Sequence, residues 1–341
     1  MSVDELPEPG TDAFDDLVAS ARRKRDVVVR SGAGRAPWAA DAIAALGASG
    51  APLTWAGRRS ELPDELSPDI ADVITGDVQP DRHGRELQSI RVRRAALRHQ
   101  GGQGSDVDAP GVSVLLASKR PADVERAVGF VARQRHVDVQ LLVGLHGSGW
   151  NEDSIRSVRA SAPDDTEIVQ FDADRNLGDL LGALTSMARH DLVTKWDDDD
   201  WYGPDHLGDL CLAYRYSGAD VVGKAAEFVY VERSDLTIRR FAYGAESYSR
   251  TLAGGTLLTS TEWLEQVGGW RPVARGVDRE LLADTERVGG TSYRTHGFQY
   301  VLRRRGDAAH TWAAPDSGFL AAATDRRPGL DLVFADVEGP S

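Results

Sequence analysis

The sequence predicts an α/β protein built on a mostly parallel, doubly wound sheet. Val112–Ala117 and Val139–Leu145 are continuous apolar runs, which are typical of strands covered on both faces. A helical pattern begins at Pro121, and another helical segment runs directly into an apolar strand at Leu192–Trp196. This alternation of strands and helices favours a parallel sheet, in which ligands bind beyond the carboxyl ends of the strands.

The length of 341 residues is enough for two domains. Before the apolar runs, Asp26–Arg30 and Pro52–Ala56 are predicted strands, and Ala39–Leu46 and Arg82–His99 are predicted helices. The glycines after the first of these strands lack the spacing of a dinucleotide-binding loop. The predicted divisions are a flexible acidic lead at 1–20, a small α/β region at 21–100, a linker at 101–111, the main domain at 112–313 and a C-terminal tail at 314–341.

Composition narrows the class of protein. A net charge of −13 argues against general nucleic-acid binding, which needs basic surfaces. With Cys211 as the single cysteine, no intramolecular disulfide and no cysteine-rich zinc site can form. No secretory signal and no membrane-spanning apolar run is visible. We therefore expect a soluble cytoplasmic protein without a transmembrane segment, with a peripheral position at the inner membrane face as an alternative.

The most informative stretch is Asp197–Asp200, which follows the apolar strand directly. Adjacent carboxylates at the end of a buried strand would lie in the ligand crevice and offer the oxygen ligands that Mg²⁺ and Mn²⁺ prefer. An isolated acidic run is more often a solvated turn or a surface calcium site. The flanking Trp196, Trp201 and Tyr202 favour the metal site over these alternatives.

Several segments together resemble the ordered motifs of family 2 inverting glycosyltransferases. The segments are Val112–Pro121 (VSVLLASKRP), Asn176–Gly178 (NLG), Trp196–Leu207 (WDDDDWYGPDHL), Gly254–Leu258 (GGTLL) and Val267–Trp270 (VGGW). The resemblance covers about 200 residues and implies a GT-A fold, a nucleotide-diphosphate sugar donor (UDP-, GDP- or dTDP-linked) and a hydroxyl acceptor on a cell-surface polysaccharide or glycoconjugate. The N-terminal region more faintly resembles part of a GT-B-type half, as a remnant.

The resemblance also implies roles for single residues. Asp199 would ligate Mn²⁺ or Mg²⁺ together with Asp197, and Asp197 or Asp198 would lie near the ribose. Asn176 would lie near the diphosphate, although a helix cap is an equally good interpretation. The residues expected to contact the donor are Ser118, His146, Arg175, Asn176, Asp197, Asp198 and Gly255.

Asp278 is the expected general base, which would take the proton of the acceptor hydroxyl. The family has an acidic pair here, whereas this chain has Val277 before the Asp. A helix cap is the alternative role for Asp278, and Glu280 is the reserve candidate. His146 also departs from the family, which usually has an acid there. His310, which follows a predicted strand at Tyr300–Arg304, is the candidate third metal ligand, with a structural histidine as the alternative.

Two other functions compete. A sugar-phosphate nucleotidyltransferase would carry a glycine-rich basic loop after the first strand, where this chain has Ser118–Pro121 without a glycine. A catalytically silent glycan- or nucleotide-binding module would not need Asp278. Cys211 is predicted to pack in the core. Arg303–Arg305 and Arg239–Arg240 are predicted to be solvated basic segments, with a diphosphate or acceptor contact as the alternative.

Overall fold

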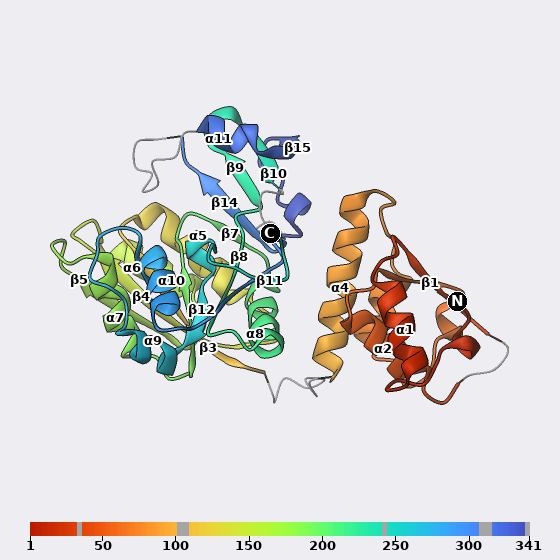
Figure 1. Ribbon diagram of the computed structural model, residues 1–341. Helices are drawn as coiled ribbons and strands as arrows, with labels where there is room; N and C mark the ends of the chain where they lie inside the picture. The colour runs from red at the N-terminus through yellow and green to blue at the C-terminus, as the bar shows by residue number, and fades with distance from the viewer. Residues whose placement is uncertain (33–35, 101–108, 241–243, 307–315, 338–341) are drawn as a thin grey trace. The chain divides into compact units, whose positions relative to one another are not determined.

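The computed structural model describes residues 1–32, 36–100, 109–240, 244–306 and 316–337. The chain forms two compact units, Met1–Asp108 and Ala109–Ser341 (Figure 1). In the described residues, no helix combines the length and the apolar character needed to cross a membrane.

The N-terminal unit is built on two parallel strands, β1 and β2. Helix α2 forms the crossover between them, because parallel strands need a long connection. Its core includes Val29, Ile43, Leu53 and Ile70, whose side chains are fully buried. The elements are α1 (Asp12–Ala21), β1 (Val27–Arg30), α2 (Ala39–Ala48), β2 (Leu53–Ala56), α3 (Pro68–Thr75) and α4 (Arg82–Gln100).

The prediction of a flexible acidic lead at 1–20 was wrong. Helix α1 lies in this segment and is capped by Thr11, whose hydroxyl accepts a hydrogen bond from the Phe14 amide at 3.3 Å. Val3, Leu6 and Phe14 are buried in the core of the unit. The acidic composition concealed these few apolar anchors, which bury enough surface to order the segment.

The second unit contains an eight-stranded sheet. Strands β6, β3, β4 and β5 are mutually parallel, which confirms the α/β class, whereas β12 is antiparallel to both of its neighbours. In spatial order the strands are β11 (Ser247–Tyr248), β13 (Ser292–Thr295), β8 (Val221–Lys224), β12 (Leu258–Ser260), β6 (Leu192–Trp196), β3 (Gly111–Ser118), β4 (Asp138–His146) and β5 (Thr166–Phe171).

Helices cover the parallel part of this sheet. Leu115 of β3 packs with Leu180 and Leu184 of α7, and because alternate residues of a strand face opposite sides, Val114 is buried against the other layer. Helix α5 begins with Pro121 at its first turn, as the sequence predicts. The helices are α5 (Pro121–Ala132), α6 (Glu152–Ser161), α7 (Leu177–Thr185), α8 (His206–Ser217), α9 (Thr261–Val267) and α10 (Val277–Arg287).

A second sheet of five strands completes the unit. Its spatial order is β15 (Ala323–Pro328), β10 (Leu236–Arg240), β9 (Phe228–Val231), β14 (Tyr300–Arg304) and β7 (Trp201–Tyr202). The expected tail at 314–341 is therefore part of the unit: α11 (Asp316–Ala321) precedes β15, which pairs with β10, and Phe334 and Val337 are buried.

Candidate active site

The four aspartates Asp197–Asp200, here called the acidic turn, link the two sheets of the second unit. They follow β6 of the large sheet and precede β7, which pairs with β14 of the small sheet. Strand β6 runs parallel to β3, with Trp196 opposite Leu116, so the acidic turn lies beyond the carboxyl ends of both strands. This is the edge at which ligands bind in parallel α/β sheets.

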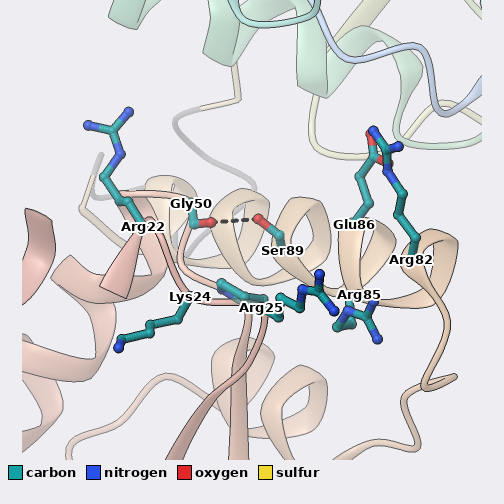
Figure 2. Close-up of a pocket in the computed structure, with 9 residues that line it drawn as sticks. Arg22, Lys24, Arg25, Gly50, Arg82, Arg85, Glu86 and Ser89 are labelled. Carbon is teal, nitrogen blue, oxygen red and sulfur yellow. Dashed lines mark hydrogen bonds between the residues drawn. The ribbon is translucent and has the colours of Figure 1, made fainter. Parts of the chain in front are cut away.

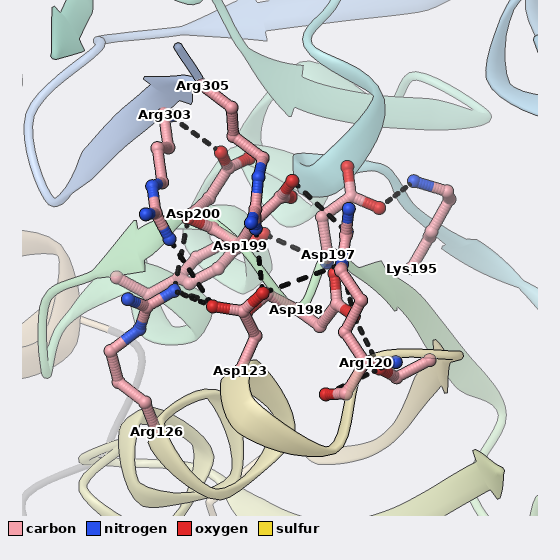
Figure 3. A network of polar contacts seen from close by, with 12 residues as sticks. Arg120, Asp123, Arg126, Lys195, Asp197, Asp198, Asp199, Asp200, Arg303 and Arg305 are labelled. Carbon is pink, nitrogen blue, oxygen red and sulfur yellow. Dashed lines mark hydrogen bonds and ion pairs between the residues drawn. The ribbon is translucent and has the colours of Figure 1, made fainter. Parts of the chain in front are cut away.

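Arg120 ties two members of the acidic turn to the end of β3 (Figure 3). The buried Asp198 accepts hydrogen bonds from the Ser118 hydroxyl and from Arg120, whose Nε lies at 3.1 Å. The same guanidinium is 3.1 Å from the carboxylate of Asp199. Burial alone would lower the pKa of Arg120, but the charges of Asp198 and Asp199 outweigh it and raise the pKa. Sequence analysis missed Arg120, since nothing in the motif around it shows a contact 78 residues away.

Asp200 is bound to β14 of the small sheet and supports the turn. Its side chain is buried and accepts hydrogen bonds from the Tyr300 hydroxyl at 2.6 Å and from the Arg303 amide at 2.8 Å. Burial, followed by the charges of its aspartate neighbours, raises the pKa of its carboxyl. We infer that Asp200 joins the acidic turn to β14 and takes no direct part in ligand binding.

The charge on Asp199 is only partly compensated. Burial, and then the nearby carboxylates of Asp198 and Asp197, raise its pKa to about 6, although Arg120 opposes the shift. A cation beside Asp199 would relieve this repulsion, and the side chain of Asp197 is 35% exposed at the same turn. These carboxylate oxygens therefore fit Mn²⁺ or Mg²⁺.

The chain supplies few further ligands in the part that the structure describes. No group of three or more His, Cys, Asp or Glu side chains there has the arrangement of a metal site. Most of the coordination would then come from substrate phosphates and water, as is common for Mg²⁺. His310, the predicted third ligand, lies outside the described residues.

Two glycines bring Asp197 and Asp278 close together. A Cβ on Gly255 would lie 2.8 Å from the Asp197 carboxylate, and a Cβ on Gly254 would overlap the carboxylate of Asp278. Lys195 pairs with Asp197 and interacts electrostatically with Asp278 as well. Burial would lower the pKa of the Lys195 ammonium, but these two carboxylates raise it. The expected metal-site acid and the expected base thus lie at one loop, with Lys195 within reach of both.

Asp278 does not cap its helix. The N-cap of α10 is Gly276, with φ +74°, and Asp278 lies in the first turn without a capping hydrogen bond. Its side chain is half-buried and makes no hydrogen bond within the described part of the chain. By contrast, the reserve candidate Glu280 pairs with Arg271 at 3.0 Å and with Arg279 at 3.1 Å. The two acids therefore differ: the Asp278 carboxylate is available to a substrate, whereas the Glu280 carboxylate is already paired with two arginines.

The other residues expected to contact the donor lie along the same edge of the sheet. His146 ends β4 opposite Phe171 of β5, and its Nε2 is buried without a partner among the described residues. Arg175 is exposed and lies over the Phe171 ring at 5.5 Å. Asn176 caps α7 by accepting a hydrogen bond from the Asp179 amide at 3.0 Å. Within the described chain, no hydrogen bond or ion pair joins these residues to the acidic turn.

Three more arginines surround the acidic turn (Figure 3). Arg126 donates to two backbone carbonyls of the turn, each at 3.3 Å, and its guanidinium lies over the Trp201 ring. Arg303 and Arg305 both pair with Asp123, at 3.3 and 2.7 Å. The prediction of a solvated basic segment at 303–305 was wrong here, because the Arg303 side chain is only 16% exposed.

Two further predictions concern residues outside the site. Cys211 is buried in α8, and burial raises the pKa of its thiol to about 12, so the prediction of core packing is confirmed. Arg239 is not solvated as expected: it is buried and pairs with Glu227 at 2.6 Å.

The chain is similar in fold to solved glycosyltransferases. No protein-family model matches the sequence, and no curated protein matches it. Residues 1–349 of S. aureus TarS, solved with UDP-GlcNAc, are 14% identical, with a TM-score of 0.46 over 60% of this chain and 61% of that chain. The mannosyltransferase PcManGT from Pyrobaculum calidifontis, solved with GDP-Man and Mn²⁺, is 15% identical, with a TM-score of 0.47 over 61% and 60% of the two chains. The chain spans less than two thirds of either structure. At TM-scores below 0.5, we assign neither donor nor metal from these similarities.

Proposed function

We propose that the second unit is a metal-assisted, inverting glycosyltransferase of GT-A type, similar to family 2. It would move a sugar from a nucleotide-diphosphate donor to a hydroxyl of a glycan or glycoconjugate, on the cytoplasmic side. The observation that carries the proposal is the convergence of Asp197 and Asp278 on the Gly254–Gly255 loop, beyond the carboxyl end of β6. Direct displacement at a sugar carbon needs these two functions close together: a place for the diphosphate and a base for the acceptor.

Asp199 and Asp197 are the residues that would hold Mn²⁺ or Mg²⁺. The raised pKa of Asp199, caused by burial and by its carboxylate neighbours, supports this role, because these carboxylates lack full compensation within the protein. A divalent cation bound there would neutralise charge developing on the leaving diphosphate. Lys195 orients Asp197 through their ion pair.

Asp278 is proposed as the base. Its carboxylate would accept the proton of the acceptor hydroxyl while the acceptor oxygen forms a bond to the anomeric carbon and the bond from that carbon to the diphosphate oxygen breaks. The half-buried position and the absence of a hydrogen-bonding partner in the described chain leave the carboxylate available. Unlike glycoside hydrolysis, this reaction needs no second carboxylic acid for the leaving group.

The donor would extend along the carboxyl ends of β3, β4 and β5. Ser118 would act indirectly, by holding Asp198. His146 and Arg175, which meet at Phe171, are proposed to contact the nucleotide; the unpartnered Nε2 of His146 supports this role. A nucleotidyltransferase is disfavoured, because Arg120 is committed to Asp198 and Asp199, so the segment after β3 does not form a free phosphate loop.

The test is turnover of nucleotide sugars with and without Mn²⁺, for wild type, Asp278→Asn and Glu280→Gln. A panel of UDP-, GDP- and dTDP-sugars, screened by metal-dependent thermal stabilisation, identifies the donor first. We expect metal-dependent release of nucleoside diphosphate that falls at least about 100-fold in Asp278→Asn, in the range of a lost general base. Glu280→Gln should change turnover by less than about threefold, because the Glu280 carboxylate is paired with Arg271 and Arg279.

Three outcomes would reject the proposal. Donor binding without turnover in any variant indicates a silent binding module. Release of pyrophosphate from a nucleoside triphosphate and a sugar phosphate indicates a nucleotidyltransferase. Equal loss of activity in Glu280→Gln and Asp278→Asn removes Asp278 from the role of base.

A further inference from the structure

The N-terminal unit contains a pocket that the proposed transferase reaction does not use. It has a volume of about 620 Å³ and lies where the chain enters β1 and β2, beside the first turns of α4 (Figure 2). Its lining residues are Arg22, Lys24, Arg25, Gly50, Pro52, Arg82, Arg85, Glu86 and Ser89. It is therefore at the amino ends of the two parallel strands, opposite to the edge where a dinucleotide loop would lie.

The lining of this pocket is strongly basic. Five of its side chains, those of Arg22, Lys24, Arg25, Arg82 and Arg85, are cationic and one, that of Glu86, is anionic, so the lining carries a net charge of +4. The whole chain has a net charge of −13. A concentration of like charge in one concave site raises the local potential and favours small anions over the rest of an acidic surface.

Within the described chain, the protein does not neutralise three of these cations. The side chains of Arg22, Lys24 and Arg25 are exposed and make no ion pair there. Arg85, in the first turn of α4, donates to the carbonyl of Pro80 just before the helix, and this neutral acceptor leaves the charge of Arg85 uncompensated. The arginines around the acidic turn behave differently, since each pairs with carboxylates or backbone carbonyls of the turn and of Asp123.

A hydrogen bond between α4 and the turn before β2 holds two of the lining residues, Ser89 and Gly50, together. The Ser89 hydroxyl of α4 donates to the Gly50 carbonyl at 2.6 Å, joining the helix to the turn before β2 (Figure 2). Gly50 has φ +85°, a conformation that side chains rarely adopt, so the shape of this turn depends on glycine. Arg82 and Arg85 thus lie on the first turns of α4, and Arg22, Lys24 and Arg25 lie in the short connection between α1 and β1.

We propose that this pocket binds a phosphate or diphosphate group. Guanidinium groups donate parallel hydrogen bonds that match phosphate oxygens, and the negative charges of a diphosphate offset much of a lining of +4. The phosphate belongs either to a free phosphorylated molecule or to the headgroup of an anionic lipid. The site lies in a different compact unit from the acidic turn, so this inference is independent of the proposed transferase reaction.

The test is calorimetric titration of the full chain with inorganic pyrophosphate, in EDTA so that no divalent cation is available at the acidic turn. The lining variants are Arg25→Gln and Arg85→Gln. The control is Arg23→Gln, which removes the same charge from the same exposed run but does not line the pocket. We expect each lining variant to weaken pyrophosphate binding about tenfold and the control to weaken it less than twofold. Binding should also weaken as salt rises, because screening shortens the range of the interaction.

A second arm separates the two sources of phosphate. Co-sedimentation with phosphatidylglycerol vesicles, lost in Arg25→Gln and Arg85→Gln but kept in Arg23→Gln, assigns the pocket to a lipid headgroup. Pyrophosphate binding without vesicle binding assigns it to a free phosphate ester. The inference is overturned if neither probe binds at millimolar concentration, if Arg23→Gln weakens binding as much as Arg25→Gln, or if only a single-stranded oligonucleotide binds.

Discussion

Replacing Asp199 by Asn separates the proposed metal-binding role of the acidic turn from its role in stability. The carboxylate of Asp199 is held among Asp197, Asp198 and Arg120, and its pKa is raised from 3.8 to about 6 by burial first and by the two neighbouring carboxylates second. Asn has nearly the same shape and no charge. If the charge serves a bound cation and not the fold, then the variant should be more stable than wild type in the absence of metal.

The size and the pH dependence of this stabilisation follow from the ordinary pKa of Asp199 and its raised pKa in the folded protein. At about 1.4 kcal/mol per pKa unit, a pKa of about 6 in the folded state against 3.8 corresponds to about 3 kcal/mol of lost stability above pH 6. Because the folded pKa is raised, the protonated carboxyl of Asp199 favours folding below pH 4, and this contribution is lost as the pH rises through 6. Asn should therefore stabilise the unit at pH 7.5, by about 2–4 °C per kcal/mol, and have no such effect near pH 4.

The assay is thermal unfolding with and without Mn²⁺, at pH 7.5 and pH 4.5. In EDTA at pH 7.5, Asp199→Asn should unfold at a higher temperature than wild type. Added Mn²⁺ should raise the unfolding temperature of wild type and leave that of the variant unchanged. At a Mn²⁺ concentration one hundred times the dissociation constant, the stabilisation of wild type should be about 2.7 kcal/mol. Asp198→Asn is the contrasting variant: Asp198 accepts hydrogen bonds from Ser118 and Arg120, so its replacement should lower the transition. A destabilised Asp199→Asn, or equal stabilisation of both proteins by Mn²⁺, refutes the reasoning.

Two further predictions concern the loop that joins the acid and the base. Lys195→Met should lower kcat about 10- to 100-fold, the range expected when a charged hydrogen bond to Asp197 is lost. The control Lys195→Arg, which keeps the charge, should retain more activity. Equal kcat in wild type and Lys195→Met would show that the ammonium has no part in the reaction. Gly254→Ala should fold but lose turnover, because its methyl group would displace the Asp278 carboxylate. The control is Gly182→Ala in α7, where no atom lies within 4 Å of the added carbon; it should keep full activity and raise the free energy of unfolding by about 0.5–1 kcal/mol. An active Gly254→Ala contradicts the convergence of acid and base at the Gly254–Gly255 loop.

The parallel core was predictable because its strands are buried on both faces. Val112–Ala117 and Val139–Leu145 correspond to β3 and β4, and the predicted strand at Leu192–Trp196 has the bounds of β6. Strand β5 escaped prediction since its residues are mostly half-buried at the edge of the sheet, and it lacks a continuous apolar run. In the small sheet, the predicted strand at Tyr300–Arg304 has the bounds of β14. The sheet as a whole was not predicted, because its strands come from distant segments and the pairing of β7 with β14 has no local signal.

The site was predictable as a set of acids but not as a set of contacts. Local motifs single out Asp197–Asp200 and Asp278 as candidate site residues, because their residue types and strand context are local. The residues that restrain them were not visible: Arg120 and Tyr300 reach the acidic turn across 78 and 100 residues. For Asn176 the sequence left a cap and a ligand contact as equal alternatives, and the structure shows the cap.

Four consecutive aspartates would repel one another if all faced the same space, and the fold resolves this by giving them different environments. Asp200 faces Tyr300 in the small sheet, and Asp198 faces Arg120 at the end of β3. Asp197 and Asp199, which pair with Lys195 and Arg120, are the two members proposed to bind the cation as well. Because the turn begins in one sheet and ends in the other, these directions are fixed by two separate strand pairings, β6 with β3 and β7 with β14. The proposed metal site would thus depend on the packing of both sheets, and a loosened β14 should impair metal binding although no residue of that strand is a proposed ligand.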